Sequence, residues 1–494
     1  MPIDSADVCE RFVGTAGVWA SAPSLSFSNP SLMRWRSEYS FGSVAAGYDC
    51  RRDSRSVSVQ SGRSETAGIF DARAYIHASG STLWGKAAYR NGKRRDVQWN
   101  EAADYGHVYP YVSADETGGP MDLEIYSFSG GYAGHKGRWN YGAAMSYDAG
   151  LYFRKTDPRP RDVTGDLHIS AGAAYSVRPD YLMGLSVLFE RYTQASDIMF
   201  VSEMGETTIY HLTGLGTHYA RFDGVGKTTS YKGYTYGASV NVFPTGNGAF
   251  VSLQASRMTL DYIITDLNRL PMAALWQNSM TVQAGWRAGT KEHRWAACLD
   301  FDVSRRHGTE NIFGDAASSV YPQIASLEMF ADNRLKAGLE VVYEHVFPGA
   351  ALRPRLGIKA SAAYSHARQV HLLPFRAMEV NMWNVGLGAV LASRLSGRLA
   401  GHIDAGAYVG IPGAGCLLDI TEGVDTDVDR MLASAVSSNY DCASARMFCV
   451  GSKAGIMYAL NRRYAVGIEA AYTHRRYSLP VDVNEFSVSV LFCF

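Results

Sequence analysis

The stretch RWNYGAAMSYDAGLYF, residues 138–153, alternates apolar and polar side chains along its length. Its odd positions, from Trp139 to Phe153, are all apolar or aromatic, whereas its even positions include Asn140 and Asp148. Successive side chains of a β-strand point to opposite faces of the sheet, so this pattern predicts a strand with one apolar face. Such a face needs either a protein core or lipid, and the rest of the chain decides between them.

The same alternation recurs at residues 355–364 and 463–475 and in the final VNEFSVSVLFCF at 483–494. Runs of this kind hold for about 12 to 17 residues, longer than the roughly 5 to 6 of a globular strand and sufficient for the roughly 9 to 11 of a tilted membrane crossing. No stretch approaches the roughly 18 apolar residues that a spanning helix needs. Strand length therefore favours a membrane barrel, with a soluble protein of two sandwich domains as the alternative fold.

The predicted connections alternate between tight turns and longer loops. This parity is typical of outer-membrane barrels, whose short turns face the periplasm and whose longer loops face outward. Tight turns are expected at Ser79-Ser81, His135-Gly137, Arg178-Asp180, Pro244-Gly248, Gly289-His293, Pro348-Ala350, Ser396-Gly397 and Asn461-Arg463. Longer connections are expected at 93–120, 154–162, 200–228, 265–271, 306–324, 370–375, 412–445 and 478–482.

The pattern as a whole predicts an all-β protein, a single transmembrane antiparallel β-barrel of about 18 strands, with 16 to 20 allowed. Residues 36–494 form this barrel, and residues 1–35 form an N-terminal periplasmic or lumenal segment. In hydrocarbon every backbone N–H and C=O needs a partner, so an open sheet edge would be costly. The last strand should therefore pair with one near the N-terminus.

The alternation also assigns side chains to the two faces of the barrel wall. Lipid-facing positions are expected at Tyr141, Met145, Leu356, Ile358, Val466, Ile468, Phe486, Val488, Val490, Phe492 and Phe494. Polar lumen-facing positions are expected at Asp300, Asp302, Lys336, Glu340, Glu344, Arg355, Lys359, Asp404, Lys453, Glu469 and Arg475. Mixed charges of this kind either line a conduit or form ion-pair ladders that stiffen the wall, and the ladder is the favoured interpretation.

Composition excludes some classes of protein. Lys and Arg total 47 and Asp and Glu total 47, so there is no basic excess of the kind that marks nucleic-acid binding. The start, MPIDSADVCERF, lacks the basic and apolar regions of a secretory signal, so we expect a processed start. Of the seven cysteines, Cys416 and Cys442 flank one long loop and could form a disulfide, or could remain small buried hydrophobes.

We predict no catalytic residues, cofactor or metal. The chain contains no G-x-S-x-G, H-E-x-x-H or C-x-x-C motif. Four histidines could lie on the outer side and bind a metal or haem, but such coincidences are expected among 13 histidines: His211, His218, His366 and His371. Asp425, Asp427 and Asp429 have a spacing similar to calcium ligands, although the start of a surface helix explains the same acidic residues better.

Three stretches carry a family resemblance. WNEAADYGHVYPYVSAD (99–115), YSFSGGYAG (126–134) and TDPRPRD (156–162) resemble, in this order, an uncharacterised family of outer-membrane β-barrels of Bacteroidota. The resemblance implies an outer-membrane location and company with TonB-dependent uptake systems. It carries over no catalytic residue.

These observations leave three hypotheses about function. The first is a non-enzymatic outer-membrane barrel involved in uptake, either as accessory partner of a TonB-dependent receptor or as a channel. The second is a structural or surface-binding barrel whose extracellular loops bind a partner, and the third and weakest is an outer-membrane hydrolase. The expected partners are outer-membrane lipid and another outer-membrane protein, either a TonB-dependent receptor or a surface lipoprotein, and not nucleic acid.

Overall fold

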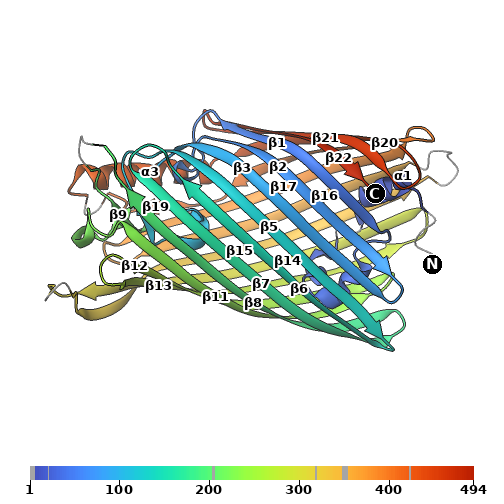
Figure 1. Ribbon diagram of the computed structural model, residues 1–494, viewed down its shortest axis with the longest axis horizontal. Helices are drawn as coiled ribbons and strands as arrows, with labels where there is room; N and C mark the ends of the chain where they lie inside the picture. Colours follow the sequence, from blue (N-terminus) through green and yellow to red (C-terminus); the bar gives the residue numbers. More distant parts are fainter. Residues whose placement is uncertain (1–5, 20–21, 203–205, 317–319, 348–353, 422–423) are drawn as a thin grey trace.

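In the computed structural model, long antiparallel strands wind around a common axis and close on themselves (Figure 1). The structure describes residues 6–19, 22–202, 206–316, 320–347, 354–421 and 424–494. The main sheet has 19 strands, of which the short β19 (Cys416–Leu418) is an addition to the edge of β17, leaving 18 in the barrel wall. The predicted all-β barrel of about 18 strands is confirmed.

The wall strands are joined in chain order. They are β1 Phe41–Asp53, β2 Ser64–Ala78, β3 Ser81–Val97, β5 Gly119–Lys136, β6 Trp139–Phe153, β7 Arg159–Arg178, β8 Tyr181–Met199, β11 Thr228–Pro244, β12 Gly248–Ile264, β13 Leu270–Gly289, β14 His293–Phe313, β15 Gln323–Val346, β16 Arg355–His371, β17 Arg376–Arg394, β18 Leu399–Pro412, β20 Met447–Ala459, β21 Ala465–Tyr477 and β22 Asp482–Cys493. No helix of the described residues is long and apolar enough to cross a membrane.

The last strand closes the barrel. β1 pairs with β2 on one side and with β22 on the other, where Val44 lies opposite Phe492. The backbone N–H groups of Gly42 and Phe494 each donate to the other residue's carbonyl oxygen, at 3.0 and 2.9 Å. The 18 wall strands therefore form a continuous ring of pairings, as expected for a sheet with no free edge.

Register separates the side chains of the wall into two faces. Glu340 lies opposite Cys298 and Ser361, and the same parity continues around the barrel to Asp404, which lies opposite Lys453. The structure places every polar residue predicted for the lumen on the inner face and every residue predicted to contact lipid on the outer face. Many of the outer side chains are strongly exposed, for example Ile468 at 52% and Val490 at 58%.

The connections fall at two ends. At one, named here the short-turn end, tight turns join β2 to β3, β5 to β6 and their counterparts around the barrel, and the start of α1 and the C-terminus lie there (Figure 1). The opposite, long-loop end carries the longer connections. The expected turn at Pro348-Ala350 lies outside the described residues. The loop expected at 306–324 is shorter than predicted, because β14 continues to Phe313 and β15 begins at Gln323.

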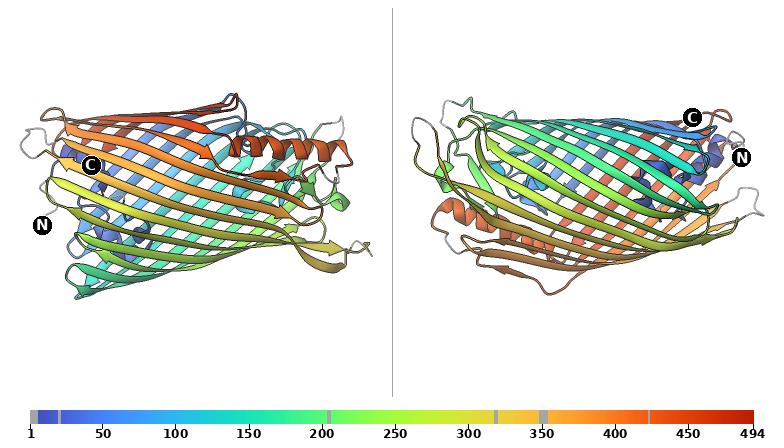
Figure 2. Two further views of the ribbon diagram at one scale, coloured as in Figure 1. Left: turned by 180° about the vertical axis from the view of Figure 1, so that it is seen from behind. Right: turned by 90° about the horizontal axis from the view of Figure 1, so that it is seen from below.

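Smaller elements occupy the two ends (Figure 2). Near the short-turn end are α1 Val8–Thr15, η2 Ser24–Ser28 and η3 Pro30–Trp35. At the long-loop end are η4 Val59–Ser61, α2 Tyr105–Val108, β4 Val112–Ala114, β9 Tyr210–Gly214, β10 Thr217–His218, η5 Ala220–Phe222 and α3 Asp427–Ala443. β4, β9 and β10 form a separate three-stranded sheet.

The loop between β18 and β20 departs from one sequence expectation. Cys416 lies in β19, opposite Glu379 of β17, whereas Cys442 is buried near the end of α3. Both are free thiols, so the disulfide considered from the sequence is not formed. The acidic residues of this loop do begin a helix, since Thr426 and Asp429 form a reciprocal capping box at the start of α3.

Candidate functional site

The connection between β3 and β5 folds into the lumen. This segment, residues 98–118, is named the plug loop. Its contacts reach distant parts of the wall: the Tyr231 hydroxyl of β11 donates to the carbonyl of Tyr111 at 3.0 Å, and Arg306 of β14 donates to the carbonyl of Tyr109 at 2.7 Å. The Tyr109 hydroxyl donates to Gln369 of β16 at 3.1 Å. The plug loop therefore spans the interior at the long-loop end.

An apolar core holds one side of the plug loop. Val108 and Tyr111 are almost completely buried against side chains of β8 and β11 to β14. Within this core the rings of Tyr231 and Tyr262 stack with centroids 4.8 Å apart. Burial of aromatic and aliphatic surface at this scale stabilises a fixed position for the loop, because each large side chain contributes roughly 1.5 to 3 kcal/mol.

A buried ion-pair cluster fixes the other side. Arg154, which directly follows β6, places its two terminal nitrogens 2.8 Å from Glu101 and 3.3 Å from Asp115, and all three side chains are fully buried. Burial and the neighbouring Asp115 carboxyl raise the pKa of Glu101 well above its usual range. Burial alone would also raise the pKa of Asp115, but Glu101, Arg154 and the Gly118 N–H lower it, so Asp115 carries the charge.

Two of the three stretches that carry the family resemblance meet at this cluster. Glu101 and Asp115 belong to WNEAADYGHVYPYVSAD, and Arg154 also donates to the carbonyl of Pro158, which belongs to TDPRPRD, at 3.3 Å. Sequence analysis recognised both stretches but did not connect them. Arg154 itself lies between them in space and outside both in sequence.

A second inward segment, residues 206–227, pairs with the plug loop through β4 and β9. His211 in β9 is fully buried, with Nδ1 2.6 Å from the Tyr262 hydroxyl and Nε2 2.9 Å from the carbonyl of Val225. His218 lies between Asp223 and Asp429 at 3.0 and 3.3 Å. Burial lowers the pKa of His218, but the two carboxylates outweigh it and raise the pKa.

The remaining histidines of the predicted outer set have other partners. His366 contacts Asn381, and His371 contacts Glu310 and the carbonyl of Pro374. Each of the four histidines thus has its own hydrogen-bond partners, and the structure does not gather them into one ligand set.

The described parts of the N-terminal segment, residues 6–19 and 22–35, lie inside the barrel near the short-turn end. Val8 and Phe12 of α1 are buried against Ala400, Met457 and Leu491 of the wall. Asp7 caps the start of the helix: its side chain accepts from the Glu10 N–H at 2.9 Å and pairs with Arg394. This half of the segment is held by a small apolar cluster and one partly buried ion pair.

Further along the same segment, Asn29 is fully buried. Its amide donates to Asn241 of β11 at 3.0 Å, and its carbonyl oxygen accepts from the Ser31 N–H at 3.0 Å. Gly142 and Gly172 on the inner wall make room for this turn: a Cβ at Gly142 would lie 2.5 Å from Pro30, and one at Gly172 would meet the Asn29 oxygen. The close approach requires glycine on the wall.

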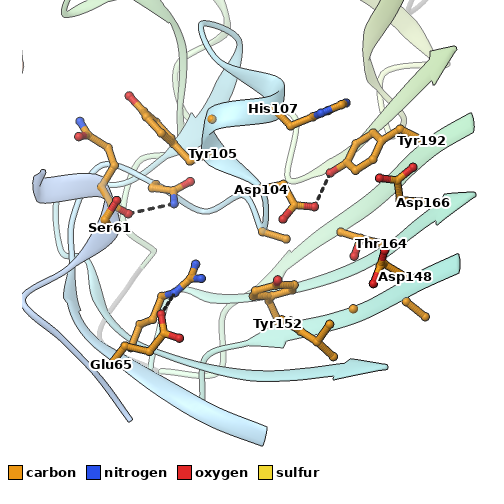
Figure 3. Close-up of a pocket in the computed structure, with 18 of the residues that line it drawn as sticks. Ser61, Glu65, Asp104, Tyr105, His107, Asp148, Tyr152, Thr164, Asp166 and Tyr192 are labelled. Atoms are coloured by element: carbon orange, nitrogen blue, oxygen red, sulfur yellow. Dashed lines mark hydrogen bonds and ion pairs between the residues drawn. The ribbon is translucent and has the colours of Figure 1, made fainter. Parts of the chain in front are cut away.

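A cavity of about 670 Å³ lies beside the plug loop (Figure 3). Strands β1 to β3 and β5 to β8 supply its wall, and Asp104, Tyr105 and His107 of the plug loop project into it. Asp104 accepts from the Tyr192 hydroxyl at 2.9 Å. On the opposite side Arg94 donates to Glu65 at 2.8 Å, so its charge is already paired.

One wall of the cavity is acidic. Asp148 and Asp166 lie directly opposite each other on β6 and β7, and Asp104 faces them from the plug loop. No Lys or Arg of the described residues forms an ion pair with any of these three carboxyls. Burial raises the pKa of Asp104, and Asp166 and Asp148 add to the effect. Burial, with the Arg306 charge, lowers the pKa of His107 to about 4, so His107 is neutral at pH 7.

Three groups at the edge of this wall could hold a cation. Asp166, His168 and Glu190 each offer one donor atom, and these atoms lie within 4.8 Å of one another. His168 and Glu190 are directly opposite on β7 and β8, and the His168 nitrogens are 3.2 Å from Asp166 and 3.7 Å from Glu190. One imidazole and two carboxylates suit a divalent ion such as zinc. The same three side chains also contact one another directly, which is an alternative reason for their arrangement. Sequence analysis missed this set, because the pairing depends on register.

The lumen residues predicted from the sequence lie elsewhere on the wall. Lys453 pairs with Glu469 at 3.1 Å, Lys359 with Glu340 at 2.6 Å, and Arg355 approaches Glu344 at 3.6 Å. These contacts join neighbouring strands, which is the ladder arrangement. The cavity is lined instead by residues of β1 to β3, β5 to β8 and the plug loop.

The fold and its interior define an 18-strand β-barrel whose lumen contains segments of its own chain. The chain belongs to the family described as "Family of unknown function (DUF6850)", whose model matches residues 30–494. No curated protein matches the sequence.

Solved structures with a similar fold include several outer-membrane proteins. The copper transporter OprC is 8% identical, with a TM-score of 0.41, and 92% of this chain and 80% of that chain are covered. The ferric preacinetobactin receptor BauA from Acinetobacter baumannii is 7% identical, with a TM-score of 0.40 and coverage of 92% and 80%. The ferric enterobactin receptor PfeA from Pseudomonas aeruginosa is 8% identical, with a TM-score of 0.37 and the same coverage. At these scores the likeness supports no inference about ligand or mechanism.

Proposed function

We propose that this chain is an outer-membrane barrel that takes part in uptake as accessory partner of a TonB-dependent receptor and catalyses no reaction itself. The apolar outer face and the alternation of short turns with long loops support insertion with the short-turn end in the periplasm. The three sequence stretches that resemble Bacteroidota barrels support the association with TonB-dependent uptake. The partner role, rather than the channel, rests on one observation: the plug loop reaches strands on several sides of the lumen.

Conductance in planar bilayers separates the two roles. The matched variants replace residues 99–115 with a glycine-serine linker of equal length or, as a control at the same end, carry Met431→Asp at an exposed position of α3. We expect the intact chain and the control to be silent and the plug variant to give stable currents, because an 18-strand wall is wide enough for an aqueous channel once emptied. Equal currents from the intact chain and the plug variant would establish a channel instead.

Purification from native membranes tests the partner directly. The tagged chain, cross-linked before extraction in mild detergent, should bring down a TonB-dependent receptor in comparable amount, whereas an unrelated tagged barrel should not. Recovery of the chain alone after cross-linking would contradict the proposal.

The long-loop end gives the surface-binding alternative a specific basis. α3 begins with a full capping box and packs Leu432 and Ala435 against Trp99 and Tyr210, so this end is a folded platform that leaves Met431 exposed. Substitution Met431→Asp should then abolish capture of a partner outside the cell while the barrel remains folded. Under the accessory role, capture of the receptor should survive that substitution.

A further inference from the structure

A groove of about 570 Å³ on the outer face interrupts the apolar wall across β11 to β14. The row of side chains nearer the long-loop end is polar. Tyr236, Arg257, Asn278 and Arg305 lie directly opposite one another in successive strand pairs. Directly opposed residues in antiparallel strands have Cβ atoms about 4.5 to 5.5 Å apart, so the two arginines flank the asparagine amide within reach of one small ligand group.

The row on the short-turn side of these residues is apolar. It consists of Ala238, Ala255, Met280 and Val303, which are also directly opposed. The two alanines leave a trough between the larger Tyr236 and Met280, both of which are exposed. A hydrocarbon chain is the kind of group that such a trough accommodates.

The arginines lack a counter-charge within the protein. Among the described residues no carboxylate forms an ion pair with Arg257 or Arg305, and both side chains are exposed on the outer face. The Arg257 guanidinium lies 5.4 Å from the centre of the Trp276 ring, which is on the long-loop side of the polar row. An unpaired arginine on a lipid-facing surface is costly unless it lies at the interface and meets an anion there.

Depth along β14 places Arg305 at such an interface. On β14 the outer face carries Trp295 near the short turn, then only apolar side chains, and then Arg305 ten residues later. A strand tilted by about 40° rises roughly 2.5 Å per residue along the barrel axis, which puts Arg305 roughly 25 Å from Trp295. That is about the height of the apolar band of an outer-membrane barrel. The groove therefore begins at the headgroup level of the outer leaflet.

We propose that this groove binds one phosphorylated lipid of the outer leaflet. The phosphate lies between Arg257 and Arg305 and accepts from the Asn278 amide, and an acyl chain lies over Ala238 and Ala255. The order of the two rows, cationic at the interface and apolar toward the bilayer centre, matches the order of headgroup and chain in such a lipid. Arginine suits this role because its planar fork matches phosphate oxygens in pairs. The inference rests on the proposed function, since it requires the barrel to be in the membrane.

Native mass spectrometry of the detergent-purified full chain tests the site, with dioleoyl phosphatidic acid as the probe and dioleoylglycerol as the phosphate-free comparison. Arg257→Gln with Arg305→Gln should weaken phosphatidic acid binding by roughly tenfold or more, since the variant loses the charged hydrogen bonds of both guanidinium groups to the phosphate. The matched control, Arg52→Gln with Arg161→Gln, removes two other exposed outward arginines and should leave binding unchanged. Ala255→Leu, which fills the trough and keeps the arginines, should also weaken binding.

Three results would overturn the inference: equal binding by the Arg257 and Arg305 double variant, equal binding of dioleoylglycerol, or displacement of phosphatidic acid by an equal concentration of inorganic phosphate. The last would identify a free-anion site. Heat-dependent gel mobility checks that each variant is folded. A barrel that inserts into bilayers but fails to bind phosphatidic acid contradicts only this inference, whereas a chain that does not insert contradicts the proposed function as well.

Discussion

The lumen contains two segments of the same chain that are held by different physical means. The plug loop is anchored at both ends and combines an apolar core with the fully buried Arg154 cluster. The N-terminal segment combines a small apolar cluster around Val8 and Phe12 with neutral amide and hydroxyl hydrogen bonds around Asn29 and one partly buried ion pair at Asp7. A buried charge cannot lose one partner cheaply, whereas neutral contacts can be lost one at a time. We therefore infer that the plug loop opens as a unit and the N-terminal segment loosens in steps.

The largest difference should come from Arg154→Met. It leaves the Asp115 charge buried without its partner, so the free energy of opening the plug loop should fall by roughly 3 to 5 kcal/mol. Hydrogen exchange measured by mass spectrometry on peptides within 99–115 reports this, and peptides within 22–35 should not change. The control Arg161→Met alters an exposed outward arginine. A loss below about 1 kcal/mol would show that the apolar core alone holds the loop.

Asn29→Ala should produce the next largest effect, in the other segment. It removes the hydrogen bonds to Asn241 and Ser31 and leaves the buried Ser31 N–H without its acceptor, at a cost of about 1 to 3 kcal/mol. Exchange should rise in peptides within 22–35 and stay constant within 99–115, and Ser28→Ala, an exposed neighbour, serves as the control. Exchange that rises equally in both segments would mean that they are coupled.

Lowering the pH should remove a stabilising contribution from the plug loop specifically, because His107 lies in that segment. The folded pKa of about 4 lies below the unfolded value of 6.5, so His107 stabilises the plug loop fully above pH 6.5 and loses that contribution as pH falls toward about 4. Glu101 and Asp104 have raised pKa values and act in the opposite direction in wild type and variant alike. We therefore compare thermal unfolding of wild type with His107→Gln, which should lose less stability between pH 6.5 and 4.5. Parallel pH profiles would rule out this role of His107.

The smallest effect is expected at Asp7. Asp7→Asn retains the helix cap and removes only the charge opposite Arg394, which at this exposure should cost no more than about 1 kcal/mol. Asp7→Ala also removes the cap on the Glu10 N–H and should cost roughly 1 kcal/mol more. Exchange of peptides within 8–15 measures both. If the asparagine variant were the more damaging, the ion pair would matter more than the cap.

The sequence predicted the strands of the barrel wall well, because the patterns that indicate strands and turns are local. Strand alternation, as in residues 138–153, and the tight turns depend on neighbouring residues only. The plug loop was expected to be an outer loop, since its partners are on strands far away in sequence. A signal was nevertheless present: Trp99, Tyr105, Tyr109 and Tyr111 are too many aromatic side chains for a solvated loop.

The cavity was beyond the reach of sequence reasoning for a related reason. Asp148 and Asp166 look like ordinary lumen positions until the register of β6 and β7 places them opposite each other. Asp104 joins them only because the plug loop folds inward. The lumen residues predicted from single strands, such as Lys453 and Glu469, form wall ladders instead.

The plug loop also constrains the order in which the protein can assemble. It connects the third and fourth wall strands, but its hydrogen bonds to Tyr231, Arg306 and Gln369 join residues 120, 197 and 260 positions apart. Contacts of such long sequence separation form late, because the intervening chain must be ordered first. We therefore expect the lumen of the inserting barrel to be free of the plug loop at first. The plug loop should take its place only after the later wall strands have paired.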